Sequence, residues 1–126
     1  MKLIIVLSIL LFTACTGVSQ NKSDVGNINK QQLEKLVEDT NVIIMDVRTP
    51  EEVSEGYIKG TSVFLNFYDP EFDNKISGLD KNKTYIIYCR SGSRSSKAGK
   101  KLIEKGFKKV HNLEGGISGW NGEIIK

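Results

Sequence analysis

The sequence predicts an α/β domain with a mainly parallel sheet flanked by helices on both faces. Two apolar runs, 42–47 and 84–88, are typical of strands that are buried on both sides of a sheet. Segments with helical character, 29–37 and 95–105, alternate with these strands. Such alternation is typical of parallel sheets with helical crossovers, and the length of 126 residues fits one domain.

The first half of the domain carries two helix-start signals. Asn29 followed by Gln32 indicates a capped helix, with Leu33, Leu36 and Val37 on one face. After the first strand, Thr49-Pro50-Glu51-Glu52 starts a short helix, because Thr caps it and Pro fits its first turn. Gly56 and Gly60 bracket a turn, 62–65 is the next strand, and 69–76 is a short helix.

The second half repeats the pattern. The strand 84–88 leads into a loop and then into the helix 95–105, which Gly106 closes and behind which Phe107 packs. A short strand at 110–113 follows, and Gly115-Gly116 permits a tight turn toward Trp120. Because ligands of such sheets bind outside the carboxyl ends of the strands, the residue after Tyr88 lies at the expected binding edge.

That residue is Cys89, which opens a loop rich in Gly and Ser. The loop residues are Cys89, Arg90, Ser91, Gly92, Ser93, Arg94 and Ser95. Backbone N–H groups of such a loop can point inward, and the following helix start adds partial positive charge. This field favours thiolate over thiol. A buried structural cysteine is the plain alternative, but two arginines within five residues argue against an apolar pocket.

Four segments together resemble the rhodanese (thiosulfate sulfurtransferase) family, single-domain type. They are Asp46–Glu52, Glu55–Thr61, Cys89–Ser95 and Leu113–Trp120, in the family's order. The sequence departs from the family where Tyr57 replaces the usual His and Thr61 the usual Ala. The usual His is not the family's catalytic base, so the change bears on packing or on the pocket rim.

The resemblance implies a sulfurtransferase with Cys89 as its catalytic nucleophile. Cys89 would take a sulfane sulfur from a small anionic donor, thiosulfate or a similar molecule, as a persulfide. A thiol or cyanide would then accept the sulfur. Residues Arg90, Ser91, Gly92, Ser93, Arg94 and Ser95 would bind the donor, with no cofactor and no metal. We expect the domain to act as a monomer.

Two other functions fit a reactive Cys loop. A cysteine phosphatase or arsenate reductase has five residues between Cys and Arg, whereas four separate Cys89 from Arg94 and the phosphatase position holds Ser95. The tighter ring fits a sulfur-sized target better than a phosphate. A non-catalytic sulfur-binding module is the third possibility, and it would be expected to lose Cys89 or the arginines.

The remaining polar residues favour structural roles. His111 lies in a predicted strand and could act as a base for the thiol only if the tertiary fold happened to place it beside Cys89. For Asp46 and Arg48 we favour an internal charge pair, with Glu51, Glu52 or the flanks of the Cys89 loop as further candidate partners. For Trp120 we favour a core or rim aromatic. We interpret the lysines in and after the predicted helix 95–105 as its solvent-exposed face rather than as a surface that attracts anions. No long basic run with interleaved aromatics indicates nucleic-acid binding, and one His with one or two Cys cannot form a typical zinc site.

The N-terminus resembles a bacterial lipoprotein signal. Lys2 precedes an almost entirely apolar stretch from Leu3 to Phe12, and Thr13-Ala14-Cys15 follows. The stretch is shorter than the roughly 20 residues of a transmembrane span. We therefore expect residues 1–14 to be a signal peptide, 15–24 a tether lipidated at Cys15, and 25–126 the rhodanese-like domain.

This reading predicts an exported, membrane-anchored lipoprotein in the periplasm or cell envelope. If Cys15 carries lipid, Cys89 is the only free thiol of the processed chain, because the sequence holds two cysteines. Loss of Lys2 lowers the formal charge from +3 to +2, since 3 − 1 = 2. An unpaired reactive thiol outside the cytoplasm needs a reason, and sulfur carriage is one.

Overall fold

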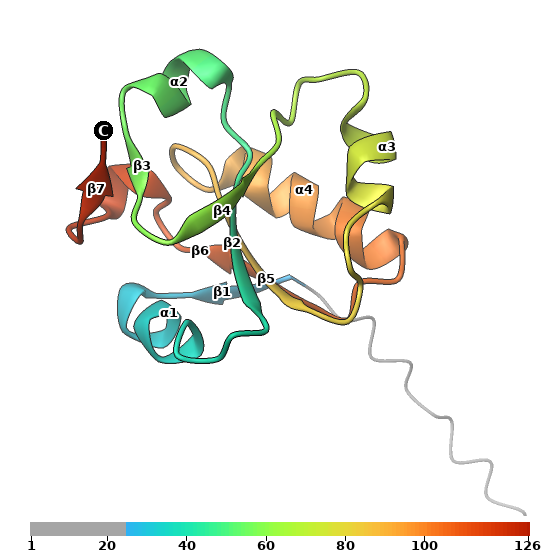
Figure 1. Cartoon of the computed structure of the whole chain (residues 1–126), viewed down its shortest axis with the longest axis horizontal. Helices are drawn as coiled ribbons and strands as arrows, with labels where there is room; N and C mark the ends of the chain where they lie inside the picture. Colours follow the sequence, from blue (N-terminus) through green and yellow to red (C-terminus); the bar gives the residue numbers. More distant parts are fainter. Residues whose placement is uncertain (1–24) are drawn as a thin grey trace, which may run out of the picture.

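A five-stranded parallel sheet forms the centre of the molecule (Figure 1), in a computed structural model that describes residues 25–126. Its strands are β1 (Gly26–Ile28), β2 (Val42–Asp46), β4 (Thr61–Phe64), β5 (Thr84–Tyr88) and β6 (Lys109–Leu113). The spatial order is β1-β6-β5-β2-β4, and every neighbouring pair is parallel. The predicted α/β class is therefore confirmed, and β5 occupies the middle of the sheet.

Helices cover both faces of this sheet, as predicted. The helical elements of the described residues are α1 (Lys30–Leu36), α2 (Pro50–Ser54), α3 (Phe72–Ser77), α4 (Ser93–Glu104) and the 3-10 turn η1 (Ile117–Gly119). One buried cluster joins α3 and α4 to the sheet, and the other contains α1 residues with η1 packed against it. Figure 1 shows α1 on the opposite side of the strands from α3 and α4.

Strand β5 supplies side chains to both clusters by simple alternation. Tyr85 and Ile87 belong to the α3–α4 cluster, whereas Ile86 and Tyr88 belong to the α1 cluster. All four are fully buried. Burial on both faces of the sheet thus explains why every residue from Tyr85 to Tyr88 is apolar or aromatic. Because side chains alternate along the strand, the next residue, Cys89, lies on the α4 face.

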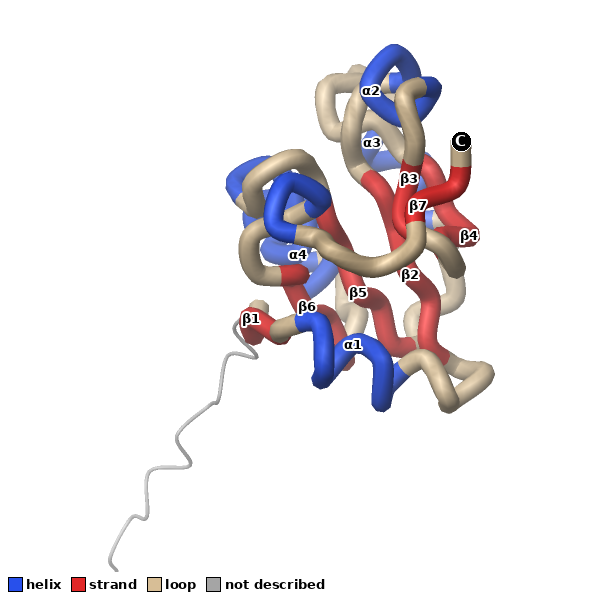
Figure 2. The backbone as a smooth tube through the Cα atoms, turned by 90° about the vertical axis from the view of Figure 1, so that its left-hand side faces the viewer, coloured by secondary structure: helices blue, strands red, loops and turns tan. Residues whose placement is uncertain are grey.

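A second, two-stranded antiparallel sheet joins β3 (Tyr57–Ile58) to β7 (Ile124–Ile125). Figure 2 shows β3 and β7 next to each other near the C-terminus. Gly56 lies before β3 with a φ of 134°, and its missing Cβ would lie 2.7 Å from the Ile124 side chain. The turn expected between Gly56 and Gly60 therefore also contains a strand that holds the C-terminus.

The structure extends or shifts several predicted elements. Helix α4 begins at Ser93, two residues before the predicted start, and α3 begins at Phe72 rather than at residue 69. Val37 is exposed, because it is the C-cap of α1 rather than part of its buried face. The short strands β1, β3 and β7 and the turn η1 were not predicted.

The expected signal peptide, Cys15 and tether lie in residues 1–24, outside the described residues. Within residues 25–126, no helix combines the length and apolar character needed to cross a membrane.

Candidate active site

Cys89 lies at the carboxyl edge of the sheet, directly after the central strand β5. Its side chain packs in the α3–α4 cluster, and the residue is only 1% exposed. Parallel neighbours end at the same edge: β2 ends at Asp46 and β4 at Phe64. The loops after these strands are therefore positioned to surround the thiol.

The loop after Cys89 wraps its sulfur with hydrogen-bond donors. The Gly92 N–H donates to Cys89 Sγ over 3.1 Å, and Ser95 Oγ lies 3.3 Å from the same sulfur. Gly92 has a φ of 114°, in the left-handed region that favours glycine, and it caps the start of α4. The loop therefore tightens into α4 at once, which explains why the helix begins earlier than predicted.

This environment lowers the pKa of Cys89. Burial of the thiol raises its pKa, but hydrogen bonds from the Ser95 hydroxyl and from the N–H groups of Ser95, Gly92 and Ser91 outweigh it. The net shift is downward. Cys89 is thus more ionised near neutral pH than an ordinary cysteine, as the sequence analysis expected from the loop's dipoles.

Ser95 connects the sulfur to a buried polar network. Its hydroxyl oxygen is 2.6 Å from Asn112 Oδ1 and 3.1 Å from the Gly92 carbonyl, besides its contact with the sulfur. One hydroxyl proton serves one acceptor at a time, so the Asn112 and Gly92 oxygens compete with the sulfur for it. Asn112, on β6, is fixed in turn by donating to Asn27 Oδ1 over 3.1 Å. Asn27 and Asn112 were not predicted as site residues.

The first two carbonyl groups of the loop, those of Cys89 and Arg90, accept hydrogen bonds from η1. The Ile117 N–H donates to the Cys89 carbonyl over 3.0 Å. The Ser118 N–H and hydroxyl both donate to the Arg90 carbonyl, over 3.0 and 2.7 Å. These bonds hold the start of the loop against η1, while the Gly92 N–H donates to Sγ. The Gly115-Gly116 turn brings η1 into this position.

The two loop arginines lie in different environments. Arg94 forms a bidentate ion pair with Glu52 of α2, at 2.7 and 2.9 Å, and its guanidinium lies 5.5 Å from the centre of the Tyr68 ring. Arg90 is exposed and lines a hollow of 250 Å³, whose other lining residues are Arg48, Glu52, Glu55, Ile117 and Ser118. Sequence reasoning named both arginines but not Glu52 or Tyr68 as their neighbours.

Asp46 and Arg48 form the internal charge pair that the sequence analysis favoured. Arg48 Nη2 lies 2.7 Å from Asp46 Oδ2, and the same nitrogen donates to the Gly56 carbonyl over 2.7 Å. Both side chains are buried. Burial lowers the pKa of Arg48, but the hydrogen bond and charge of Asp46 outweigh this and raise it. The pair thus ties β2 to the turn before β3.

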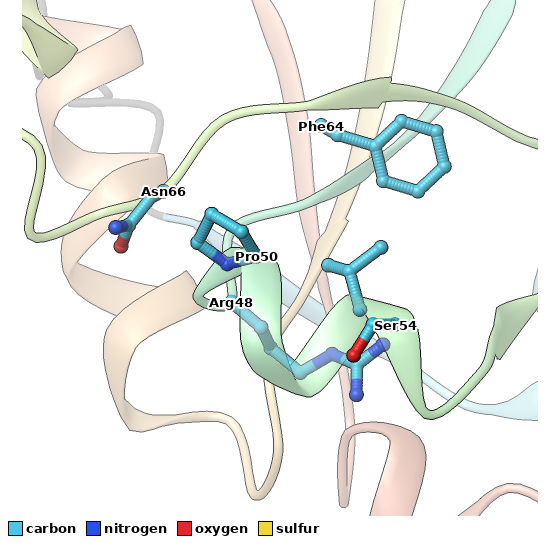
Figure 3. Close-up of a pocket in the computed structure, with 6 residues that line it drawn as sticks. Arg48, Pro50, Ser54, Phe64 and Asn66 are labelled. Atoms are coloured by element: carbon cyan, nitrogen blue, oxygen red, sulfur yellow. The ribbon is translucent and has the colours of Figure 1, made fainter.

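A second hollow, of 370 Å³, lies between α2 and β4 (Figure 3). Its lining residues are Arg48, Pro50, Val53, Ser54, Phe64 and Asn66. Figure 3 shows Phe64 on the β4 side, across from Pro50 and Ser54. Cys89 lines neither this hollow nor the one beside Arg90.

The remaining sequence candidates lie away from the sulfur's hydrogen bonds. His111 is a half-buried β6 residue whose pKa is lowered by burial, and Gly26 faces its ring. Trp120 is half-buried at the edge of the α1 cluster, with Lys30 5.6 Å from its ring centre. In the described part of the chain, no three His, Cys, Asp or Glu residues gather into a possible metal-ion group.

Comparison with known proteins agrees with this geometry. Residues 29–123 match the family model described as Rhodanese-like domain. A Bacillus subtilis protein named Putative sulfurtransferase YtwF is 46% identical over 91 residues, covering 71% of this chain and 84% of its own length. A protein from Allochromatium vinosum named Sulfurtransferase is 35% identical over 97 residues, covering 76% and 88% of the two chains.

Solved structures share the fold as well. A Rhodanese-like Domain Protein from Staphylococcus aureus superposes with a TM-score of 0.67 at 33% identity, covering 79% of this chain and 94% of that chain. Three findings agree with one another. The chain has a Cys-led loop at the carboxyl edge of a parallel sheet, it matches the family model over most of the described residues, and it has relatives that are named sulfurtransferases. The chain therefore belongs to the rhodanese-like domain family.

Proposed function

We propose that the protein is a thiosulfate sulfurtransferase that acts as a monomer and carries sulfur on Cys89. The thiolate attacks the outer sulfur of thiosulfate or a similar donor. A bond forms between Sγ and that sulfur, the donor's S–S bond breaks, and its electron pair leaves with sulfite. Cyanide or a thiol then attacks the outer persulfide sulfur, and the thiolate is regenerated.

The observation that carries this proposal is the ring of donors around Sγ. The Gly92 N–H and the Ser95 hydroxyl, 3.1 and 3.3 Å away, stabilise negative charge on sulfur without any base. Thiolate attack on a sulfane sulfur needs no general base, whereas an acyl or peptide substrate needs a proton donor for its leaving group. A thiolate held only by hydrogen bonds suits sulfur transfer.

Charge around the loop also suits an anionic donor. Arg90 is exposed directly after Cys89, and Arg94 lies in the first turn of α4. The N-terminus of this 12-residue helix adds partial positive charge near the sulfur. Together they would offset the charge of the donor and of the leaving sulfite.

Mass spectrometry tests the reaction directly. We expect the Cys89-containing peptide to gain one sulfur atom after incubation with thiosulfate and to lose it after cyanide is added. The Cys89→Ser variant should remain folded and form no thiocyanate. Full thiosulfate:cyanide transfer by that variant, or an unmodified wild-type peptide during turnover, would refute the proposal.

We also propose that the domain works outside the cytoplasm as a lipoprotein anchored through Cys15. Support comes from the sequence alone: the apolar stretch that ends at Thr13-Ala14-Cys15 and the polar residues that follow it. A lipid anchor at Cys15 would separate membrane attachment from the thiol chemistry of Cys89.

A further inference from the structure

Glu52 connects the cap of α2 to the active-site loop. It is the third residue of α2, and its carboxylate accepts from the Thr49 N–H at 3.4 Å and from the Thr49 hydroxyl at 3.2 Å. The same carboxylate accepts two hydrogen bonds from Arg94, at 2.7 and 2.9 Å. The capping box therefore fixes the carboxylate at the position where Arg94 meets it.

This contact offsets the charge of one of the two loop arginines. The two carboxylate oxygens of Glu52 contact the two terminal nitrogens of Arg94. Both side chains are largely shielded from solvent, with 16% of Arg94 and 29% of Glu52 exposed. Tyr68 covers the guanidinium from another side. Arg90, by contrast, has no ion pair among the described residues. The loop therefore presents less positive charge than its two arginines suggest.

We propose that Glu52 is a specificity-determining residue that lowers the preference of the Cys89 site for doubly charged donors. A dianion such as thiosulfate must share Arg94 with the Glu52 carboxylate, or displace it. A singly charged donor, such as an organic thiosulfonate, needs less compensating charge and can rely on the N–H groups of the loop. The inference rests on the proposed sulfur transfer and concerns its donor class.

The alternative role for Glu52 is purely structural, as a clamp that positions Arg94 and α2. The two roles predict opposite results for removal of the charge. If Glu52 opposes dianions, then loss of its charge favours thiosulfate. If Glu52 only positions Arg94, then loss of one hydrogen bond weakens the use of all donors together.

Glu52→Gln separates the charge from the structure. Gln is the other residue that completes a capping box, so the bonds to Thr49 and one bond to Arg94 can persist. Glu51→Gln is the matched control, because Glu51 lies in the same first turn of α2, is exposed, and does not contact Arg94. Both variants change the net charge equally.

The measurement is kcat/KM for two donors on the same preparation: thiosulfate, with two charges, and methanethiosulfonate, with one. Their ratio is independent of the folded fraction. For Glu52→Gln we expect the ratio to shift toward thiosulfate by about 3- to 10-fold, as for a unit charge in a partly solvated pocket. For Glu51→Gln we expect less than a twofold shift, because exposed charges are screened.

Alkylation gives a second readout that does not depend on sulfur transfer. The rate of Cys89 modification by iodoacetate, relative to neutral iodoacetamide, should rise in Glu52→Gln and not in Glu51→Gln. An unchanged donor ratio with an active wild type would overturn this inference alone, as would an equal loss with both donors. If the wild type used neither donor, the proposed function would fail first, and the alkylation ratio would still decide whether Glu52 repels anions.

Discussion

Replacement of Gly116 by alanine tests whether the turn before η1 holds the Cys89–Ser95 loop in shape. Gly116 is buried at the N-cap of η1, with φ 56° and ψ −157°. A Cβ at this position would lie 2.6 Å from the Cys89 carbonyl oxygen and 2.5 Å from that of Arg90. These are backbone atoms, so the contact cannot be relieved by rotation of a side chain.

The structure sets the size of the effect. The backbone conformation is one that only glycine adopts readily, and a side chain there costs about 1–3 kcal/mol. Contacts this short add an overpacking cost of about 1–3 kcal/mol. Because relief of one strain can relieve part of the other, we expect Gly116→Ala to lower the free energy of unfolding by about 2–4 kcal/mol. For a domain of this size, the melting temperature should fall by roughly 10–30 °C.

Activity should fall further than stability explains. The oxygens that the new methyl group would displace belong to Cys89 and Arg90, so the loop itself must move. Misplacement of a reacting group by about 1 Å can cost 100-fold in rate. We expect thiocyanate formation, measured well below the melting temperature and per folded molecule, to fall by about 10- to 100-fold.

Gly119→Ala is the matched control, because Gly119 lies in the same turn and its added Cβ would meet nothing within 4 Å. Thermal unfolding followed by circular dichroism should place this control within about 0.5 kcal/mol of the wild type. If Gly116→Ala behaved like the control in both unfolding and thiocyanate formation, the close contact of the turn with the loop carbonyls would not have the role inferred here.

Three further perturbations address other parts of the chain. Ser95→Ala removes a hydrogen-bond donor that stabilises the thiolate, so the pKa of Cys89 should rise. The pH midpoint of the alkylation rate with iodoacetamide should therefore move to higher pH. An unmoved or lower midpoint would contradict the role of the hydroxyl. Arg94→Ala should weaken thiosulfate use by about tenfold or more, as for a charge-assisted hydrogen bond of about 1.5–3 kcal/mol, whereas unchanged steady-state kinetics would show that Arg94 does not bind the donor. Cys15→Ser should block lipidation, moving the protein from the detergent phase to the aqueous phase while leaving Cys89 reactive; a wild-type protein without lipid would rule out the anchor.

Local signals in the sequence predict most of the fold. The capping box at Asn29 and the Thr49 cap of α2 form as the sequence predicts. The run 84–88 is β5 within its predicted bounds. Such signals succeed because a cap or a buried strand is decided by residues a few positions apart. The short strands β1 and β7 carry no comparable signal, because they depend on partners far along the chain, as in the pairing of Ile28 with Leu113.

The same distinction applies to the candidate site. The loop Cys89–Ser95 could be recognised from adjacent residues alone. Its partners could not: Glu52 meets Arg94 across 42 positions, and Asn112 meets Ser95 across 17. Glu52 does carry a local signal, the capping box with Thr49, but this signal points to a helix start and gives no hint of an ion pair with the loop.

The two departures from the family pattern, Tyr57 and Thr61, both contact residues of other strands. Thr61, in place of the usual Ala, brings a hydroxyl 2.9 Å from the buried Tyr88 hydroxyl, which also accepts from the Ile58 N–H over 3.1 Å. A buried phenol needs such partners, because an unsatisfied one costs about 1–3 kcal/mol. Tyr57, in place of the usual His, packs edge-on against Phe64 with ring centres 5.0 Å apart. The changed residues thus bind β3 and β4 to each other and to the central strand on the face of the sheet opposite Cys89.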